Sequence, residues 1–134
     1  MKKFVKVMAV ALVAVMALAA LVACGPNSDP DKALAALKDN GYTATKADDA
    51  ISLGFMETAL GATRGDLIAI VTGTKDKEMI SILYFKDSST ASKFYDKAEK
   101  YVEDQKDDEQ TNWQSGQSGA LVYFGTPQAV KDAR

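Results

Sequence analysis

The chain has 134 residues, with 16 basic and 18 acidic side chains and a net charge of −2 at neutral pH. This balance argues against a nucleic-acid-binding protein, because binding to phosphates requires a basic surface. The sequence contains no histidine, which excludes Ser-His-Asp and Cys-His catalysis and metal sites built on imidazole.

Residues 1–23 have the three parts of a secretory signal peptide. Three lysines within the first six residues form a basic n-region, and an unbroken apolar run follows from Val7 to Leu21. A helix of this run is about 22 Å long, shorter than the roughly 30 Å hydrocarbon core of a bilayer. A cleaved signal peptide is therefore the favoured interpretation, and an uncleaved N-terminal anchor is the alternative.

The leader ends in the tetrapeptide Leu21-Val22-Ala23-Cys24. This tetrapeptide resembles the lipobox of bacterial lipoproteins, which implies cleavage before Cys24 and attachment of diacylglycerol to its thiol. Cys24 is the only cysteine, so it has no partner for an internal disulfide in an oxidising compartment. We therefore expect a protein that lipid on Cys24 holds at the cell membrane, on its extracytoplasmic face.

The part of the chain after the leader is acidic and begins with a short tether. From residue 24 onward the net charge is −5. Residues 24–28 form the expected lipidated tether, which reaches under about 20 Å when extended. Residues 29–134 are expected to form one domain, which this tether keeps close to the membrane surface.

The pattern of residues 29–134 predicts a small α+β domain. Asp29 and Pro30 are typical of the start of a helix, and runs of β-branched and aromatic residues predict the strands. The expected elements are a helix over 30–40, strand 42–45, a short helix within 50–62, a hairpin of 67–72 and 79–85, a helix from 88 to about 106, polar turns over 107–119, strand 120–124 and a short terminal helix from 127.

After the first helix, the order of these elements is β-α-β-β-α-β. That order matches the ferredoxin-like split arrangement, which is an antiparallel sheet with helices on one face. The first helix is then an extra N-terminal element, and we expect it to cover the other face of the sheet.

An acidic cluster follows the long helix and has two interpretations. It consists of Glu103, Asp104, Asp107, Asp108 and Glu109. Such oxygen ligands suit Ca²⁺, but the spacing of an EF-hand loop is absent. A solvated, charged loop is the favoured interpretation, so we predict no metal site and no cofactor.

Arg64-Gly65-Asp66 matches a short adhesion tripeptide, but Gly-Asp before a strand is ordinary turn chemistry. Nothing in the sequence places two carboxylates across a cleft, as glycoside hydrolysis requires. We therefore assign no catalytic residue, and the protein is not expected to be an enzyme.

Trp113 is the only tryptophan and lies in a polar stretch. An exposed aromatic side chain on a polar loop is a frequent interface anchor. The other interpretation, which we favour, has Trp113 folding back over the sheet, because a core with few large apolar residues needs its area.

The function expected from these features is that of a non-catalytic interaction module that binds a protein of the cell envelope. This hypothesis predicts an exposed apolar patch, at a free sheet face or around Trp113. The alternative is a lipoprotein that binds a small ligand or a cation. The aromatic strand ends that run into helix caps, at 82–87 and 122–126, loosely resemble those of small lipoproteins of Gram-positive bacteria, and this resemblance implies no activity.

Overall fold

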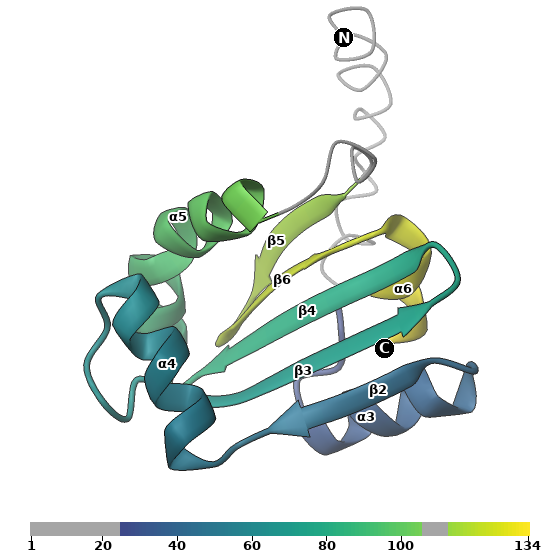
Figure 1. Ribbon diagram of the computed structural model, residues 1–134, viewed down its shortest axis with the longest axis horizontal. Coiled ribbons are helices and arrows are strands. Elements are labelled where there is room, and N and C mark those ends of the chain that lie inside the picture. Colours follow the sequence, from purple (N-terminus) through teal and green to yellow (C-terminus); the bar gives the residue numbers. More distant parts are fainter. Residues whose placement is uncertain (1–24, 106–112) are drawn as a thin grey trace, which may run out of the picture.

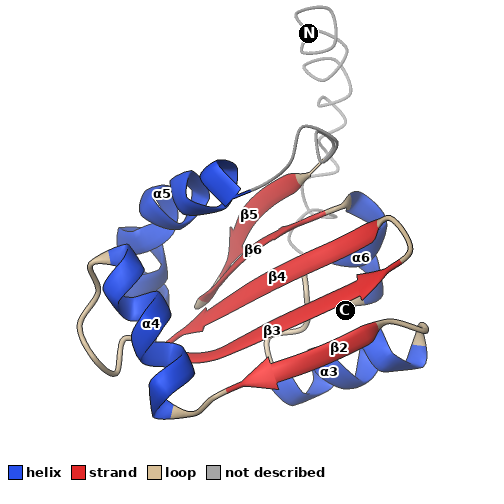
Figure 2. Cartoon of the chain, in the orientation of Figure 1, coloured by secondary structure: helices blue, strands red, loops and turns tan. Residues whose placement is uncertain are grey.

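A five-stranded antiparallel sheet with helices on both faces makes up residues 25–105 and 113–134, the part of the chain that the computed structural model describes (Figures 1 and 2). The helices are α3 (Pro30–Asp39), α4 (Ala50–Leu60), α5 (Ser88–Gln105) and α6 (Pro127–Asp132). The strands are β2 (Thr43–Ala47), β3 (Leu67–Lys75), β4 (Glu78–Phe85), β5 (Gln114–Ser118) and β6 (Leu121–Gly125). The predicted α+β class is therefore confirmed.

The strand order is β2-β3-β4-β6-β5, which differs from the predicted split arrangement. In a split β-α-β unit, two parallel strands enclose a third, whereas β2 and β3 are adjacent and antiparallel, with Thr45 opposite Thr72. The reason is that α4 stays at the end of the sheet where β2 finishes, so β3 starts from that same end (Figure 1).

Two layers of helices cover the sheet, as the extra first helix led us to expect. The residues packed on the side of α3 and α6 are Ala33, Leu37, Tyr42, Ala44, Ala69, Val71, Ile80, Ile82, Tyr84, Leu121, Ala129, Val130 and Ala133. Those on the side of α4 and α5 are Leu53, Leu60, Leu67, Leu83, Phe85, Ala91, Phe94, Ala98, Val122 and Phe124. On the α4 and α5 side the cover is partial: Thr43, Thr45, Thr72 and Thr74 of β2 and β3 are exposed there, so the uncovered part of the sheet is polar and not an apolar patch.

Strand β5 occupies a stretch that the sequence predicts as polar turns. Its five residues are two glutamines, two serines and a glycine, so the β-branched and aromatic side chains that usually signal a strand are missing. Pairing with β6 makes it a strand, with Gly116 opposite Tyr123. A Cβ at Gly116 would lie 2.5 Å from the Tyr123 hydroxyl oxygen, so a larger residue would displace that ring.

The segment expected to be a tether is packed on the α3 and α6 side of the sheet. Pro26 is buried. The Asn27 backbone N–H donates to the Ala133 carbonyl at 2.9 Å, and the Tyr84 hydroxyl donates to the Asn27 carbonyl at 2.7 Å. The chain is thus already held by the domain at the first residues that the structure describes.

Candidate functional site

Helix α4 has well-formed ends, which set its orientation on the sheet. At its N-terminus, the Asp49 carboxylate accepts from the Ser52 N–H at 2.8 Å and from the Ser52 hydroxyl at 2.9 Å. These bonds hold the pKa of Asp49 below its usual value, with the backbone bond the larger cause. At the C-terminus, Gly61 takes the left-handed conformation with a φ of 74° and ends the helix.

Apolar side chains lie on both sides of α4, although only one side faces the core. Leu53 and Leu60 are buried against the sheet. On the outer side, Ile51 and Phe55 are 76% and 75% exposed and stand one turn apart. We call the outer surface formed by Ile51, Phe55, Thr58 and Ala59 the α4 face.

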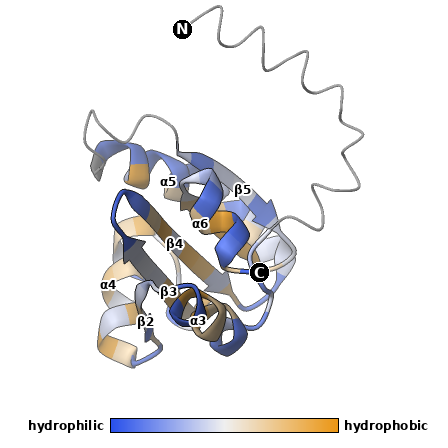
Figure 3. Cartoon of the chain, turned by 90° about the vertical axis from the view of Figure 1, so that its right-hand side faces the viewer, coloured by the Kyte–Doolittle hydropathy of each residue, from blue (hydrophilic) through white to orange (hydrophobic). Residues whose placement is uncertain are grey.

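The α4 face also lacks charge, because the one ionisable residue of the helix points inward. Glu57 is 4% exposed. Its Oε2 atom accepts from the Gly65 N–H at 2.8 Å and from the Leu67 N–H at 3.1 Å. A surface helix normally turns polar residues to solvent, whereas α4 turns its carboxylate inward and leaves Ile51 and Phe55 outside. Much of its ribbon is coloured as hydrophobic in Figure 3.

The loop that follows α4 contains the tripeptide Arg64-Gly65-Asp66, and the structure shows it as a turn. Asp66 is 6% exposed, accepts from the Thr63 N–H at 3.0 Å and pairs with Lys86 Nζ at 3.0 Å. The bond from Thr63, and then Lys86, keep the pKa of Asp66 below its usual value. This carboxylate therefore serves the turn and is not presented to a partner.

Charges of opposite sign stand at the two ends of α4. Asp48 and Asp49 precede it, and Lys46 contacts Asp48 at 3.2 Å. At the other end, a Cβ on Gly61 would lie 3.5 Å from Lys97 Nζ, so this ammonium group stands near the negative end of the helix.

An open groove of about 420 Å³ separates the C-terminal half of α4 from α5. The residues that line it are Thr58, Ala59, Leu60, Gly61, Lys97, Lys100, Tyr101 and Asp104. Two lysines against one aspartate make its charged rim positive. The basic rim of the groove thus lies beside the C-terminal end of the α4 face only.

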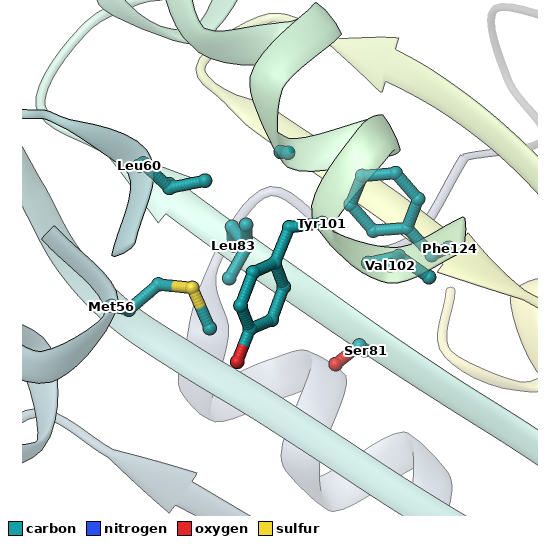
Figure 4. Close-up of a pocket in the computed structure, with 8 residues that line it drawn as sticks. Met56, Leu60, Ser81, Leu83, Tyr101, Val102 and Phe124 are labelled. Carbon is teal, nitrogen blue, oxygen red and sulfur yellow. The ribbon is translucent and has the colours of Figure 1, made fainter. Parts of the chain in front are cut away.

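A smaller cavity lies beneath this groove, where side chains from α4 and α5 converge on the sheet (Figure 4). Met56, Tyr101 and Phe124 are among its walls, and its volume is about 50 Å³. That space is large enough for only a few water molecules. Sites for drug-sized ligands measure roughly 300–1,000 Å³, so this cavity is too small for one. The groove of about 420 Å³ reaches that range but is open to solvent and does not enclose a ligand.

The residues singled out from the sequence do not gather at one site. Trp113 is half-buried and packs against the core on the α4 and α5 side, which agrees with the interpretation that it folds over the sheet. Its indole N–H is buried and has no hydrogen-bond partner among the described residues. Trp113 therefore contributes to the core, and the large apolar side chains that are three-quarters exposed belong to α4.

Cys24 lies outside the described residues, and so do Asp107, Asp108 and Glu109 of the acidic cluster. Within residues 25–105 and 113–134, no three potential ligands stand close enough together to hold a metal ion. No helix of that part of the chain is both long and apolar enough to cross a bilayer.

Comparison of the chain with protein-family models, with curated proteins and with solved structures found no match in any of the three. The α4 face is thus argued from this chain alone. Sequence reasoning predicted a short helix within 50–62 but not that one of its sides is apolar and exposed. The missed signal is that the same eleven residues carry a second apolar stripe, which contains Leu53 and Leu60. A short helix packed on a sheet buries only one of two such stripes, so the other remains exposed.

Proposed function

We propose that this chain is a non-catalytic protein-binding module that lipid on Cys24 holds at the extracytoplasmic face of the cell membrane. The observation that carries the binding function is the α4 face, where Ile51 and Phe55 are exposed on a helix without an exposed charge. Exposed apolar patches on otherwise well-covered domains mark interaction sites.

The position of the N-terminal segment supports the combination of anchor and binding surface. Pro26 and Asn27 lie on the α3 and α6 side of the sheet, whereas α4 packs on the opposite side. A lipid attached at Cys24 therefore joins the domain away from the α4 face and leaves that face open to a partner.

Site-specific photo-crosslinking of the full chain in its own host tests this function. A photoreactive phenylalanine analogue replaces Phe55 in one sample and Gln128, which is exposed on α6, in the matched control. We expect covalent adducts with a polypeptide from position 55 and none from position 128. Equal yields from the two positions, or no adduct from position 55, would contradict the proposal.

Lipid attachment is tested separately by mass spectrometry of the protein extracted from membranes. The expected N-terminal peptide begins at Cys24 and carries diacylglycerol, and Cys24→Ser should leave an unprocessed chain. An N-terminal peptide that retains residues 1–23 without lipid would contradict the anchoring part of the proposal and leave the binding part intact.

A further inference from the structure

The charges around the α4 face are arranged so that they match a second copy of the same surface. At its N-terminal end, Asp48 and Asp49 outnumber the single nearby Lys46. At its C-terminal end, Lys97 and Lys100 outnumber Asp104. The stretch between the two ends is apolar and uncharged.

We propose that two copies of this chain pack their α4 faces together as an antiparallel, two-fold symmetric pair. This inference rests on the proposed function and names the partner that the binding surface takes. A two-fold axis crossing α4 near its middle places the acidic end of one copy opposite the basic end of the other. The same rotation sets the two helix dipoles antiparallel and brings apolar residues against apolar residues.

The charge pattern favours a second copy over a membrane surface. A helix that lies on anionic lipid carries basic residues along its polar rim. Here the N-terminal end carries Asp48 and Asp49, which anionic headgroups repel. A second copy satisfies both ends at once, because it supplies lysines to the acidic end and aspartates to the basic end.

The size of the surface sets what kind of measurement is needed. An eleven-residue helix is about 16 Å long, so the paired area is at the small end for protein interfaces and the dimer is weak. Covalent trapping in the membrane therefore suits it better than co-purification. Trapping also allows the full chain to be tested in the cells that produce it.

The first experiment compares the full chain carrying Thr58→Cys with the full chain carrying Gln128→Cys, both treated with a short bismaleimide. Thr58 is part of the α4 face, and Gln128 is exposed on α6. The unaltered chain, whose single cysteine is Cys24, gives the background. We expect a crosslinked dimer only with Thr58→Cys, and adding Phe55→Asp should lower its yield about tenfold or more, since the new carboxylate would be buried without a partner.

The second experiment tests the antiparallel orientation by charge reversal in the Thr58→Cys background. Asp48→Lys alone and Lys97→Glu alone each place like charges opposite one another, so each should lower the dimer yield about two- to fivefold. When both variants are co-expressed with different tags, each contact again joins opposite charges. The mixed dimer should therefore recover the original yield.

The remaining outcomes overturn the inference. Equal crosslinking from positions 58 and 128 excludes a specific pair. Failure of the mixture to recover excludes the antiparallel orientation. Protection of the introduced thiol at position 58 without any dimer shows that a membrane or another protein covers the face. If photo-crosslinking at Phe55 then yields an adduct with a different protein, the proposed function stands and this inference fails.

Discussion

Glu57 illustrates how one side chain determines the character of the opposite side of its own helix. It accepts from the N–H of Gly65 in the following loop and from the buried N–H of Leu67 at the start of β3, and so satisfies two backbone donors. It also removes the only charge from the surface of α4. The stability of the loop and the apolar nature of the α4 face therefore have one common cause.

We expect Glu57→Ala to lower the free energy of unfolding by about 2–4 kcal/mol, because the Gly65 and Leu67 N–H groups lose their acceptor and each unsatisfied donor costs about 1–3 kcal/mol. Urea denaturation measures this change. Thr58→Ala, at the exposed neighbouring position, is the matched control and should change stability by less than about 0.5 kcal/mol. Similar values for the two variants would show that the Glu57 bonds contribute little.

Trp113 gives a second prediction at the scale of a residue. Its ring packs on the core, but its buried indole N–H lacks a partner among the described residues. Trp113→Phe should therefore cost about 0.5 kcal/mol or less, because losing the unpaired donor offsets the smaller ring. Trp113→Ala should cost about 2–4 kcal/mol, because it empties the site. Equal losses in the two variants, measured by urea denaturation, would contradict this account.

At the scale of elements, the sequence predicts well what local residues decide. Asp29 and Pro30 start α3, and the aromatic and β-branched runs make β3 and β4, close to the predicted positions. Strand β5 escapes prediction because its polar residues gain strand structure only by pairing with β6. The strand order likewise depends on where α4 rests, which is a tertiary contact. The α4 face escapes prediction for the same reason, because the two apolar stripes of the helix look alike in the sequence and only packing on the sheet decides which one is buried.

Gly54 within α4 and Gly61 at its C-cap should respond in opposite ways to alanine. Gly54 is helical and a Cβ there meets no atom within 4 Å, so Gly54→Ala should raise the free energy of unfolding by about 0.5–1 kcal/mol. Gly61 has a φ of 74°, so Gly61→Ala should lower it by about 1–2 kcal/mol. Thermal and urea unfolding of both variants measure the difference, and changes of the same sign would refute it.

At the scale of the whole molecule, helices pack on both sides of the sheet, and the domain includes residues that the sequence assigns to a tether. Asn27 is hydrogen-bonded to Ala133, just after α6, and to Tyr84 of β4, and Pro26 is buried. The free length between Cys24 and the fold is therefore shorter than the spacing alone implies. The sequence does not reveal this, because the contacts join residues more than fifty positions apart.

A chain that starts at Asp29 should be less stable than one that starts at Gly25 by about 2–4 kcal/mol. It loses two hydrogen bonds, worth about 0.5–1.5 kcal/mol each, and the burial of a proline. Urea denaturation of the two chains measures the difference. A chain that starts at Gly25 and carries Ser28→Ala, at an exposed position, controls for the change of composition. Equal stability of the two lengths would restore the tether interpretation.

The contact between Asn27 and Ala133 has a consequence for how the chain could be rewired. Because the two ends of the described chain meet, a short linker could join them and a new opening could be cut at the β3–β4 turn around Asp76. Such a circular permutant keeps every strand pair while moving the N-terminus, and with it the proposed lipid anchor, to that turn. The position of the proposed anchor is thus separable from the way the domain folds.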